Sequence, residues 1–522
     1  MLKRIPIVLL LLVSLQSFSQ TPNWSQNVAP ILYNNCVTCH RSGGIAPFAL
    51  MSYNDAITNA ATMSADVSIG KMPPWPPDVK YTHLAHERLL TAAQIKTIND
   101  WVSGGTPKGD STLAPPKPTF ATNGDLPGTP DLVIKIPAYT STSATSDVYQ
   151  CFAIPSGLLA DKYITSFEAV PGNRAIVHHV LVYTDTTGVC AHLDSLSPGP
   201  GYPNFGGVGS NSATLIGAWV PGTAPMKYPS GFGVRVPKNS YIVLQIHYPA
   251  GTAGQKDSTE LHFFFAPSPA GIRNVYIDPV LNYYNNIDRP LSIPANTVQS
   301  FYEHYALPLN FSLLGVAPHM HLLGQNIRSY YVNGADTTPL IRINKWDFHW
   351  QGFYMFPKIR KVPAGSTVYA NATYDNTTAN PENPNSPPQL VVAGEQTTNE
   401  MMLVYFVFTL YQPGDENIVI DSAVASEVTP LTYYHGQQLL DPYPNPAKDV
   451  LIAKCYFEQA DMGSMELTNI EGKVVKPLAK NMRIEQGYSS YRYSVADLPT
   501  GTYILRLTTS ERILTKKVVI EK

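Results

Sequence analysis

Charge is scarce in this sequence. Only 14% of its 522 residues are charged and the net charge is −2, whereas an average soluble domain carries about 25% charged residues. Without an excess of Lys and Arg, the chain lacks the electrostatic footprint of a nucleic-acid-binding protein. Because 44% of the residues are hydrophobic, the chain can bury cores, which excludes a mostly disordered protein. At roughly 150 residues per domain, the length predicts three or four domains.

Hydrophobic runs long enough to span a membrane are also absent from the sequence. The apolar run at residues 5–15 follows Lys3 and Arg4 and precedes small residues such as Ser19. A run of about eleven residues is too short for a bilayer, which needs about 20. Its flanks are typical of a secretory signal peptide over residues 1–19; the alternative is a lone N-terminal anchor helix. We therefore expect an exported protein, secreted or held at the cell surface.

The composition divides the rest of the chain into a helical part and a β-rich part. Ile95, Ile98 and Trp101 repeat at helical spacing, and residues 24–106 are expected to form a small all-α domain. Residues 107–125 are rich in Pro and lack periodicity, which predicts a linker that separates the domains on either side. Beyond it, short alternating segments recur about every 8–12 residues, which favours antiparallel sandwiches over βαβ units.

Cysteine is scarce too, since the chain has only five. Cys36 and Cys39 stand in CVTCH, with His40 directly after them. In this motif two thiols add to the vinyl groups of haem and the adjacent imidazole binds the iron. A redox-active cysteine pair, or a disulfide beside an unrelated histidine, is the alternative, and neither requires His40. The sequence predicts one covalent haem c in a domain that resembles a small class I cytochrome c.

The second axial ligand of this haem is less strongly indicated. Met72, in KMPPW, is a thioether on a proline-stiffened loop after the haem motif, and Met/His ligation would raise the potential. Met63 and Met51 are rivals, because a methionine is more often core filler than a ligand. We take Met72 as the expected ligand.

The other cysteines predict one disulfide. Cys151 and Cys190 lie in the β-rich part, and in an oxidising compartment they are expected to pair. Cys455 is then left over and is expected to be buried as a small hydrophobic residue.

Histidines gather in the apolar strands of the β-rich part. His319 and His321 are separated by one residue, so their side chains leave the same face of a strand and can share a metal. His178 and His179 are consecutive and would point to opposite faces. Both can bind one ion only if the backbone bulges or if they present different ring nitrogens. His247 ends a further apolar strand, and the absence of cysteine in this set argues against a closed structural zinc site.

The order of the motifs carries a resemblance to a known family. HHVLVY, GAWVPG, GVRVPKNSYIVLQIHY, PHMHLLG and NEMMLVYF follow one another within about 290 residues. In this order they resemble the copper type II, ascorbate-dependent monooxygenases. The resemblance implies a mainly β protein with two antiparallel jelly-roll-like sandwich domains, residues 126–266 and 267–425, and two copper ions.

The resemblance also assigns roles to individual residues. The residues that match the electron-transfer copper site are His178, His179 and His247. Those that match the site that binds O2 and attacks the substrate C–H bond are His319, His321 and Met401, with Tyr405 as the active-site tyrosine. A soft thioether favours Cu(I), the state that must meet O2.

Two positions depart from the peptide-hydroxylating member of that family. Ala317 and Leu403 stand where that member has an arginine and an asparagine that hold the substrate. Recognition of a peptide carboxylate is therefore not carried over to this chain.

The C-terminal residues, 440–522, resemble the sorting domain of bacterial type IX secretion, in YPNPAKDVLIA and LPTGTYILRLTT. The pattern predicts a small β-sandwich tail, and the alternative is a generic immunoglobulin-like spacer. The resemblance implies export by the type IX machinery across the outer membrane.

The sequence thus favours a secreted haem- and copper-containing monooxygenase that hydroxylates an unidentified small molecule with O2 and an ascorbate-like reductant. The haem would serve as an additional electron input, with a redox protein as a candidate partner. Two other classes stay open: an electron-transfer protein without oxygenase activity, and a surface-exposed binding module. The thioether at Met401 argues against both, because simple electron transfer needs no O2-binding site.

Overall fold

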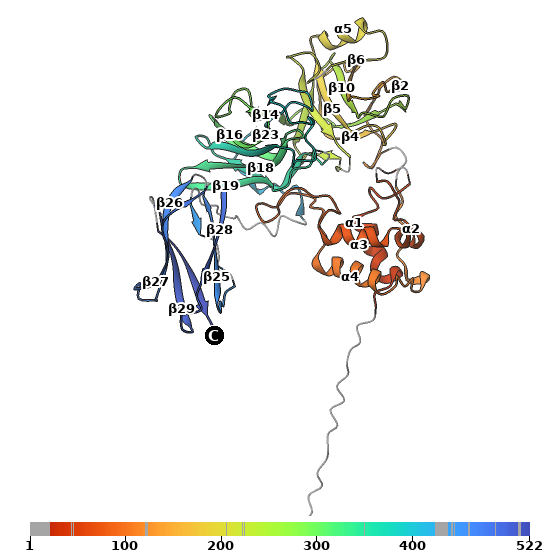
Figure 1. Ribbon diagram of the computed structural model, residues 1–522. Helices are drawn as coiled ribbons and strands as arrows, with labels where there is room; N and C mark the ends of the chain where they lie inside the picture. Colours follow the sequence, from red (N-terminus) through yellow and green to blue (C-terminus); the bar gives the residue numbers. More distant parts are fainter. Residues whose placement is uncertain are drawn as a thin grey trace, which may run out of the picture. The chain divides into compact units, whose positions relative to one another are not determined.

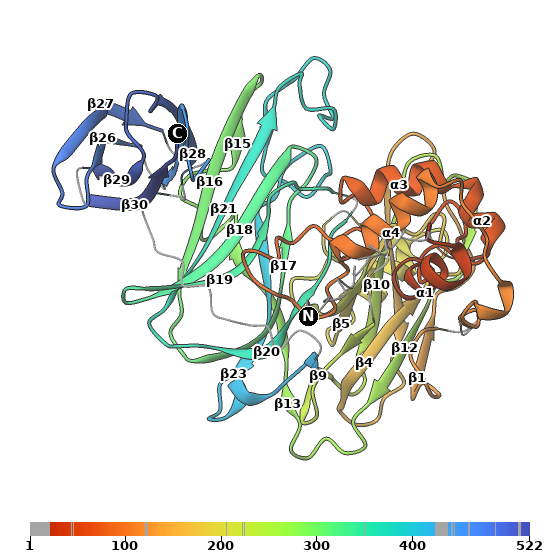
Figure 2. The same ribbon diagram turned by 90° about the horizontal axis from the view of Figure 1, so that it is seen from below.

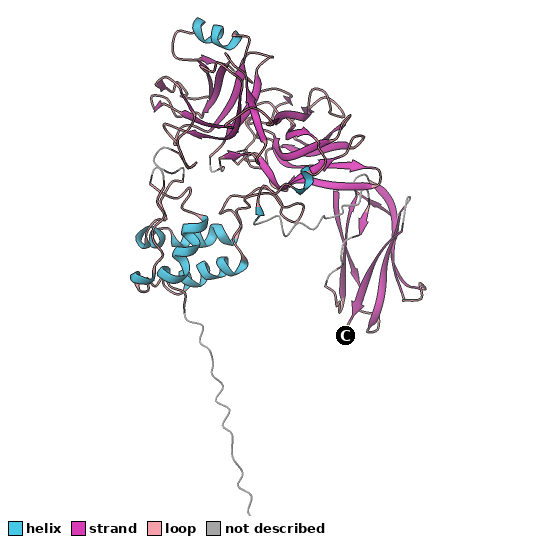
Figure 3. Ribbon diagram, turned by 180° about the vertical axis from the view of Figure 1, so that it is seen from behind, coloured by secondary structure: helices cyan, strands magenta, loops and turns pink. Residues whose placement is uncertain are grey.

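The structure is a computed structural model. It describes residues 21–522 except 43, 45, 121–123, 205, 222, 224, 349, 423–436, 440, 441, 443, 458, 459, 486 and 510–512. The expected signal peptide, residues 1–19, lies outside the described residues. The chain forms two compact units, one made of Met1–Ser329 with Leu340–Val428 and the other of Tyr330–Pro339 with Thr429–Lys522. Strands dominate both units (Figures 1 and 3), so the expectation of a mainly β protein is confirmed.

The N-terminal part is a cluster of short helices. They are the π-helix η1 (Trp24–Val28) and the α-helices α1 (Ala29–Asn35), α2 (Tyr53–Thr58), α3 (Ala60–Ser68) and α4 (Ala92–Ser103). Helix α4 begins at a capping box, in which Thr91 and Gln94 satisfy each other's backbone N–H groups, and it ends at Gly104. Its buried face places Trp101 in the centre of the helical core.

The first sandwich has two main sheets and one helix. One sheet has the order β1 (Leu132–Lys135), β12 (Glu260–Phe265), β4 (Lys162–Val170), β9 (Phe232–Val236) and β13 (Arg273–Asn274), with β8 (Met226–Lys227) on β4. The other has the order β6 (Tyr202–Pro203), β3 (Val148–Pro155), β10 (Tyr241–Tyr248), β5 (His179–Asp185) and β7 (Thr214–Trp219). The short pair β2 (Tyr139–Thr140) and β11 (Lys256–Asp257) and the helix α5 (Val189–Leu196) complete it.

The second sandwich follows the same plan. Its first sheet has the order β14 (Tyr276–Asn282), β23 (Leu403–Leu410), β17 (Phe311–His319) and β20 (Tyr354–Val362). Its second has the order β16 (Thr297–Ala306), β21 (Thr367–Asn376), β18 (Gly324–Asn333) and β19 (Asp336–Ile343), and β15 (Ser292–Ile293) pairs with β22 (Val391–Val392). Strand β21 alternates strictly between more and less buried residues, as a half-buried strand should.

One hydrophobic core joins the two sandwiches. Ile246 and Val180 of the first sandwich belong to the same buried cluster as Leu314 and Val407 of the second. Because this core is continuous, the histidine-bearing strands of both sandwiches are held in one packed body.

Residues 75–88, in the segment between α3 and α4, form an arm that packs against the second sandwich; the flanking helices α3 and α4 are orange in Figure 2. Asp78 Oδ2 lies 2.6 Å from Nη2 of Arg342, and the Asp78 backbone N–H donates to the Arg342 carbonyl at 2.7 Å. The N–H of Ala85 donates to the carbonyl of Met355 in β20 at 2.7 Å. The arm therefore binds the helical part to the β-rich part, and the linker over residues 107–125 stays a prediction.

The cysteine prediction also needs correction. Among the described residues there is no disulfide, and Cys151 and Cys190 are buried free thiols. Each thiol faces a carbonyl of the same loop: Cys151 Sγ lies 3.9 Å from the Gly207 oxygen, and Cys190 Sγ donates to the Val208 oxygen at 3.3 Å. Cys455 is buried in the core of the C-terminal unit, as expected.

The C-terminal unit is a sandwich of two small sheets. One has the order β24 (Gln438–Leu439), β25 (Val450–Phe457) and β28 (Gly487–Ser494). The other has the order β27 (Val474–Ile484), β26 (Asp461–Thr468), β29 (Gly501–Thr509) and β30 (Ile513–Ile520). Its core, which includes Leu467 and Leu505, is its own. Within the described residues, no helix of the chain has the length and apolar character needed to cross a bilayer.

Candidate metal centres

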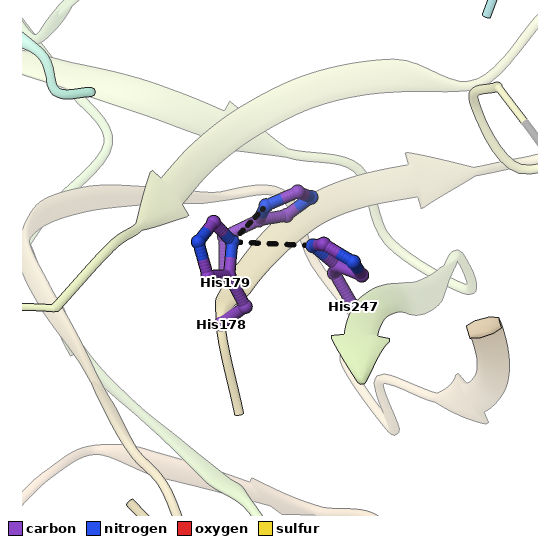
Figure 4. Close-up of side chains that lie close together, drawn as sticks. All are labelled: His178, His179 and His247. Atoms are coloured by element: carbon purple, nitrogen blue, oxygen red, sulfur yellow. Dashed lines mark hydrogen bonds between the residues drawn. The ribbon is translucent and has the colours of Figure 1, made fainter. Parts of the chain in front are cut away.

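Three histidines gather at one end of the β6-β3-β10-β5-β7 sheet. His179 is the first residue of β5 and pairs with His247 near the end of β10. His178 lies just before β5, and its backbone N–H donates to the His247 carbonyl at 2.9 Å. The three rings turn toward one another (Figure 4), and their ligand atoms all lie within 4.8 Å of one another.

The two consecutive histidines share one site because only one of them belongs to a strand. His179 is in β5, whereas His178 follows a turn at residues 174–176 and is free of strand alternation. Both present Nδ1, and these two atoms lie 3.4 Å apart. The sequence-based requirement for a bulge or for different ring nitrogens is therefore wrong, since the turn reorients His178 instead.

The spacing of the three Nδ1 atoms fits one metal ion. Nδ1 of His178 lies 3.1 Å from Nδ1 of His247 and 3.4 Å from Nδ1 of His179. Nitrogens bound to one ion at about 2.0 Å, with tetrahedral or trigonal angles, would be about 3.3–3.5 Å apart. Three imidazoles without a cysteine suit copper, and a closed structural zinc site would more typically contain thiolates.

The surroundings of this histidine triad favour the neutral form of His179 and orient the ring of His247. Burial lowers the pKa of His179 well below its usual value, and His247 and His178 lower it further. Neutral imidazole is the form that binds a metal. The outer nitrogen of His247, Nε2, lies 3.1 Å from Asp147 Oδ2, and Tyr149 stacks flat on the His247 ring with centroids 4.4 Å apart. Partners of this kind fix which ring nitrogen of His247 faces a metal.

His319, His321 and Met401 come from the paired ends of β17 and β23. His319 is the last residue of β17 and pairs with Leu403, the first residue of β23. Two residues further along each segment, the backbone N–H groups of His321 and Met401 donate to the same oxygen, Glu400 Oε2, at 2.9 and 3.2 Å. The His319 and His321 rings meet edge-on with centroids 5.1 Å apart. The two segments that carry this second set therefore lie side by side.

The two histidines of the second set present Nε2 rather than Nδ1. Nδ1 of His319 lies 2.5 Å from Gln351 Oε1, and Nδ1 of His321 lies 3.1 Å from the Asn399 carbonyl. Since an acceptor faces each Nδ1, that nitrogen carries the proton and leaves the Nε2 electron pair for a metal. Burial lowers the pKa of His319, and burial together with His319 lowers the pKa of His321 to about 3.

Glu400 joins the segment that carries His321 to the segment that carries Met401. Its carboxyl is fully buried, and Oε1 accepts the N–H of Leu323 at 2.6 Å in addition to the two bonds to Oε2. Burial raises the pKa of Glu400 to about 8, although the N–H groups of His321, Leu323 and Met401 lower it. One side chain thus holds the His321 turn against the Met401 segment.

The strand ends beside His319 are apolar apart from one tyrosine. Tyr405 pairs with Ala317 of β17, and its ring centroid lies 6.3 Å from that of Phe353. Alternate and directly paired residues share a face of a sheet, so Ala317, Leu403 and Tyr405 lie on the face of His319. Ala317 and Leu403 are both buried. No charged side chain replaces the substrate-holding pair at these two positions.

The CVTCH motif forms a tight turn at the end of α1. The backbone N–H groups of Cys39 and His40 donate to the Cys36 carbonyl at 3.1 and 2.9 Å. His40 is buried, and its Nδ1 lies 3.0 Å from the Phe48 carbonyl, which leaves Nε2 to face a ligand. The turn therefore presents two thiols and one oriented imidazole together.

The candidate axial methionines differ in their burial. Met63 is buried inside the helical core, whereas Met72 and Met51 are half-buried at its margin. A position inside the core suits packing, and a position at the margin suits a ligand. Met72 as axial ligand stays a prediction.

Two buried donors near the CVTCH motif point to an anionic group. Arg41 Nη1 and Trp75 Nε1 are buried without a hydrogen-bond acceptor in the described chain. The Arg88 guanidinium lies 5.8 Å from the Trp75 ring and acts electrostatically on Cys39. Buried donors without acceptors are rare in folded proteins and mark the place of an absent partner. The carboxylates of a haem would satisfy such donors.

Several residues of these sites escaped the sequence analysis. They are Asp147, Tyr149, Phe348, Gln351 and Glu400. None belongs to the histidine motifs, and the one local signal is that Glu400 directly precedes Met401.

Comparison with known proteins gives matches along most of the β-rich part. Residues 133–253 match the copper type II ascorbate-dependent monooxygenase N-terminal domain, and residues 301–430 match the C-terminal domain of the same enzymes. Residues 442–521 match the secretion system C-terminal sorting domain.

One curated relative and two solved structures complete the comparison. Dopamine beta-hydroxylase of Bos taurus is 22% identical over 264 residues, which cover 44% of this chain and 39% of that protein. The chain thus spans well under half the length of this relative. A beta-glucuronidase of Faecalibacterium prausnitzii (9% identity, TM-score 0.13, 43% of this chain and 37% of that chain) and one of Dictyoglomus thermophilum (11%, 0.13, 49% and 44%) are too distant in structure to carry an argument.

Proposed function

Because the chain carries both domains of the copper type II ascorbate-dependent monooxygenases, we propose that it hydroxylates a C–H bond of a small molecule with O2. One oxygen atom enters the C–H bond and the other is reduced to water, which takes two electrons and two protons. An external reductant of the ascorbate class supplies them. The observation that carries the proposal is that His178, His179 and His247 bring their ligand atoms within 4.8 Å of one another, in a sandwich whose core is continuous with that of the second sandwich.

The two ligand sets suit two different tasks. His178, His179 and His247 would hold one copper through Nδ1, and an all-imidazole set tolerates both Cu(I) and Cu(II). His319 and His321 would hold the other through Nε2, together with the Met401 thioether, which favours Cu(I). When bound, copper supplies one-electron redox chemistry and, at the second set, a site for O2. The first set would therefore pass electrons and the second would meet O2 and the substrate.

The protein contributes orientation and exclusion of water. His247 is 2% exposed, His321 3% and Met401 8%. Glu400, Gln351 and the other acceptors fix each ring before a metal binds, so little reorganisation is required.

The substrate should be less polar than a peptide with a free carboxylate. Ala317 and Leu403 offer it no charge or hydrogen bond on the face of His319, and Tyr405 is the polar group on the paired strand. Tyr405 would donate a hydrogen bond to the substrate, since burial raises the pKa of its phenol above the usual value and keeps it protonated.

We also assign a haem c to the N-terminal helical domain. Cys36 and Cys39 would hold it covalently, His40 would bind the iron through Nε2, and Met72 would be a second iron ligand. The donors of Arg41 and Trp75 that lack acceptors support this assignment. The arm at residues 75–88 keeps the domain against the second sandwich, which supports a role as additional electron input to the copper sites.

The C-terminal domain would direct the protein to its destination outside the cell. Residues 442–521 form the sorting domain that directs a chain through type IX secretion to the cell surface or beyond the cell. This domain has its own core and contributes no residue to either ligand set.

Oxygen consumption by the copper-loaded protein tests the proposal. With ascorbate and a panel of small apolar and phenolic substrates, we expect O2 uptake matched by a hydroxylated product. If copper binds at both sites but no reductant or substrate drives O2 uptake, the protein is an electron carrier rather than an oxygenase. If no copper binds, the reading as a binding module replaces both. A molecule that co-purifies with the secreted protein would identify the substrate most directly.

A further inference from the structure

One aromatic ring lies between the two ligand sets. Phe348, in the loop between β19 and β20, stacks on His178 with centroids 5.9 Å apart and planes 17° apart. The same ring meets His321 edge-on, also at 5.9 Å, with planes at 88°. Both separations lie within the range of favourable aromatic pairs, about 4.5–7 Å. The ring centroids of His178 and His321 are therefore separated by at most twice 5.9 Å, and Phe348 is the common neighbour of both rings.

The loop of Phe348 also reaches the remaining histidine of the second set. Gln351 Nε2 donates to the Phe348 carbonyl at 2.7 Å, and Gln351 Oε1 faces Nδ1 of His319 at 2.5 Å. Phe348 and Gln351 thus contact one ring of the first set and both rings of the second. These two residues, which we call the bridging loop, belong to neither histidine motif.

We propose that the bridging loop couples copper binding at the two sites, with Phe348 as the positioning residue. A metal at the first site would hold the His178 ring in its ligating orientation. Because the Phe348 ring stacks on His178, this would also restrict the position of Phe348. A fixed Phe348 in turn favours the orientations of His321 and, through Gln351, of His319. The inference rests on the proposed function only in assigning copper to both ligand sets.

The physical basis is a contiguous chain of packed rings and one hydrogen-bonded amide. Aromatic pairs contribute about 0.5–1.5 kcal/mol each beyond their buried area, and packed side chains with discrete arrangements carry energetic coupling between sites. Coupling between binding sites is reciprocal. Copper at either site should therefore raise the affinity of the other by the same factor, on the order of 5-fold or more.

Copper(I) titration against a competing chelator measures this coupling. We would compare the full chain with His247→Ala, which disables the first site, and with His319→Ala, which disables the second. We expect each variant to lower copper affinity at the remaining site by the same factor. In a Phe348→Leu background, both factors should fall to about 1. Phe353→Leu is the matched control, because Phe353 contacts Tyr405 and no ligating histidine is among its ring contacts; it should leave the coupling intact.

A measurement on the copper-free protein tests the position of Phe348 without requiring that copper binds. Phe348→Leu removes the ring current at both neighbours, so the ring proton resonances of His178 and His321 should both shift. In Phe353→Leu, the resonances of these two histidines should stay where they are in the parent. If each site binds copper with the same affinity in the single-site variant as in the parent, the coupling is overturned. The proposed function would still stand in that case. Failure of either site to bind copper in the parent would instead contradict the proposed function.

Discussion

The Glu400 carboxyl accepts the backbone N–H of His321 at 2.9 Å, across 79 positions of sequence. The same oxygen accepts the N–H of Met401 at 3.2 Å, and the other oxygen accepts that of Leu323. A buried acceptor shared by both segments fixes the spacing of the backbone segments that carry His321 and Met401.

Glu400→Gln should damage the second site and spare the first. An amide replaces one acceptor oxygen by an NH2 group, so at least one buried backbone N–H loses its partner at a cost of about 1–3 kcal/mol. Loss of a supporting partner typically weakens metal binding about 10–100-fold. We expect copper titration to show this weakening at one site and a lower melting temperature of the copper-free protein. Glu382→Gln, an exposed change in the same sandwich, is the control, and equal behaviour of the two variants would contradict the role of Glu400.

The two copper sites should be separable by substitution. His247→Ala removes one of three imidazoles and should lower copper content at the first site, while the second site still fills at saturating copper. Met401→Ala leaves two imidazoles without the soft ligand, so the oxidised protein should keep nearly both coppers while O2 uptake driven by reductant is lost. Copper analysis and an oxygen electrode measure the two effects. A Met401→Ala protein that hydroxylates as fast as the parent would rule out the thioether as a ligand.

Expression with haem-maturation machinery should give a protein with one covalent haem. The mass should exceed that of the polypeptide by one haem, and Cys36→Ser with Cys39→Ser should abolish both this increase and the haem absorbance. Met72→Ala should change the low-spin spectrum, because the iron loses its thioether. If Met63→Ala changes the low-spin spectrum and Met72→Ala does not, the iron ligand is Met63 of the helical core.

Asp78 should make the attachment of the helical domain sensitive to acid. Burial opposes ionisation of its carboxyl, but hydrogen bonds from Arg342 and Asn344 outweigh it and lower the pKa of Asp78 below its usual value. The carboxylate therefore stabilises the contact above the unfolded pKa of about 3.9 and loses this contribution as the pH falls through the lower folded value.

Cleavage of the linker tests this contact. A protease site placed in the exposed residues 111–113 should leave the helical fragment bound at pH 7, as seen by co-elution in gel filtration. The fragment should dissociate as the pH falls through the lowered folded pKa of Asp78, with circular dichroism confirming that both parts stay folded. Asp78→Asn should weaken the complex already at pH 7, whereas Asp66→Asn, on α3 and outside the arm, should not. Equal retention of both variants would show that the arm is not the main attachment.

The sequence by itself determined which chemistry each part of the chain can carry. Cys36, Cys39 and His40 lie within five consecutive residues, and the spacing of His319 and His321 places both on one face of any strand. Such local patterns need no knowledge of the fold, because residue type and strand periodicity are properties of short segments. The preference for antiparallel sandwiches followed from the same kind of pattern, and the two sandwich domains and their order followed from the resemblance to the copper monooxygenases.

Only the tertiary structure decided how these residues meet. Whether His178 and His179 share an ion depended on a turn before β5, and which ring nitrogen each histidine presents depended on acceptors such as Asn399 and Gln351. The pairing of Cys151 with Cys190 was mispredicted because compartment and spacing do not fix where two sulfur atoms point. Phe348 and Glu400 reach the sites through loops and strand ends far away in sequence. Their positions depend on strand register and core packing, which emerge only when distant segments are buried together.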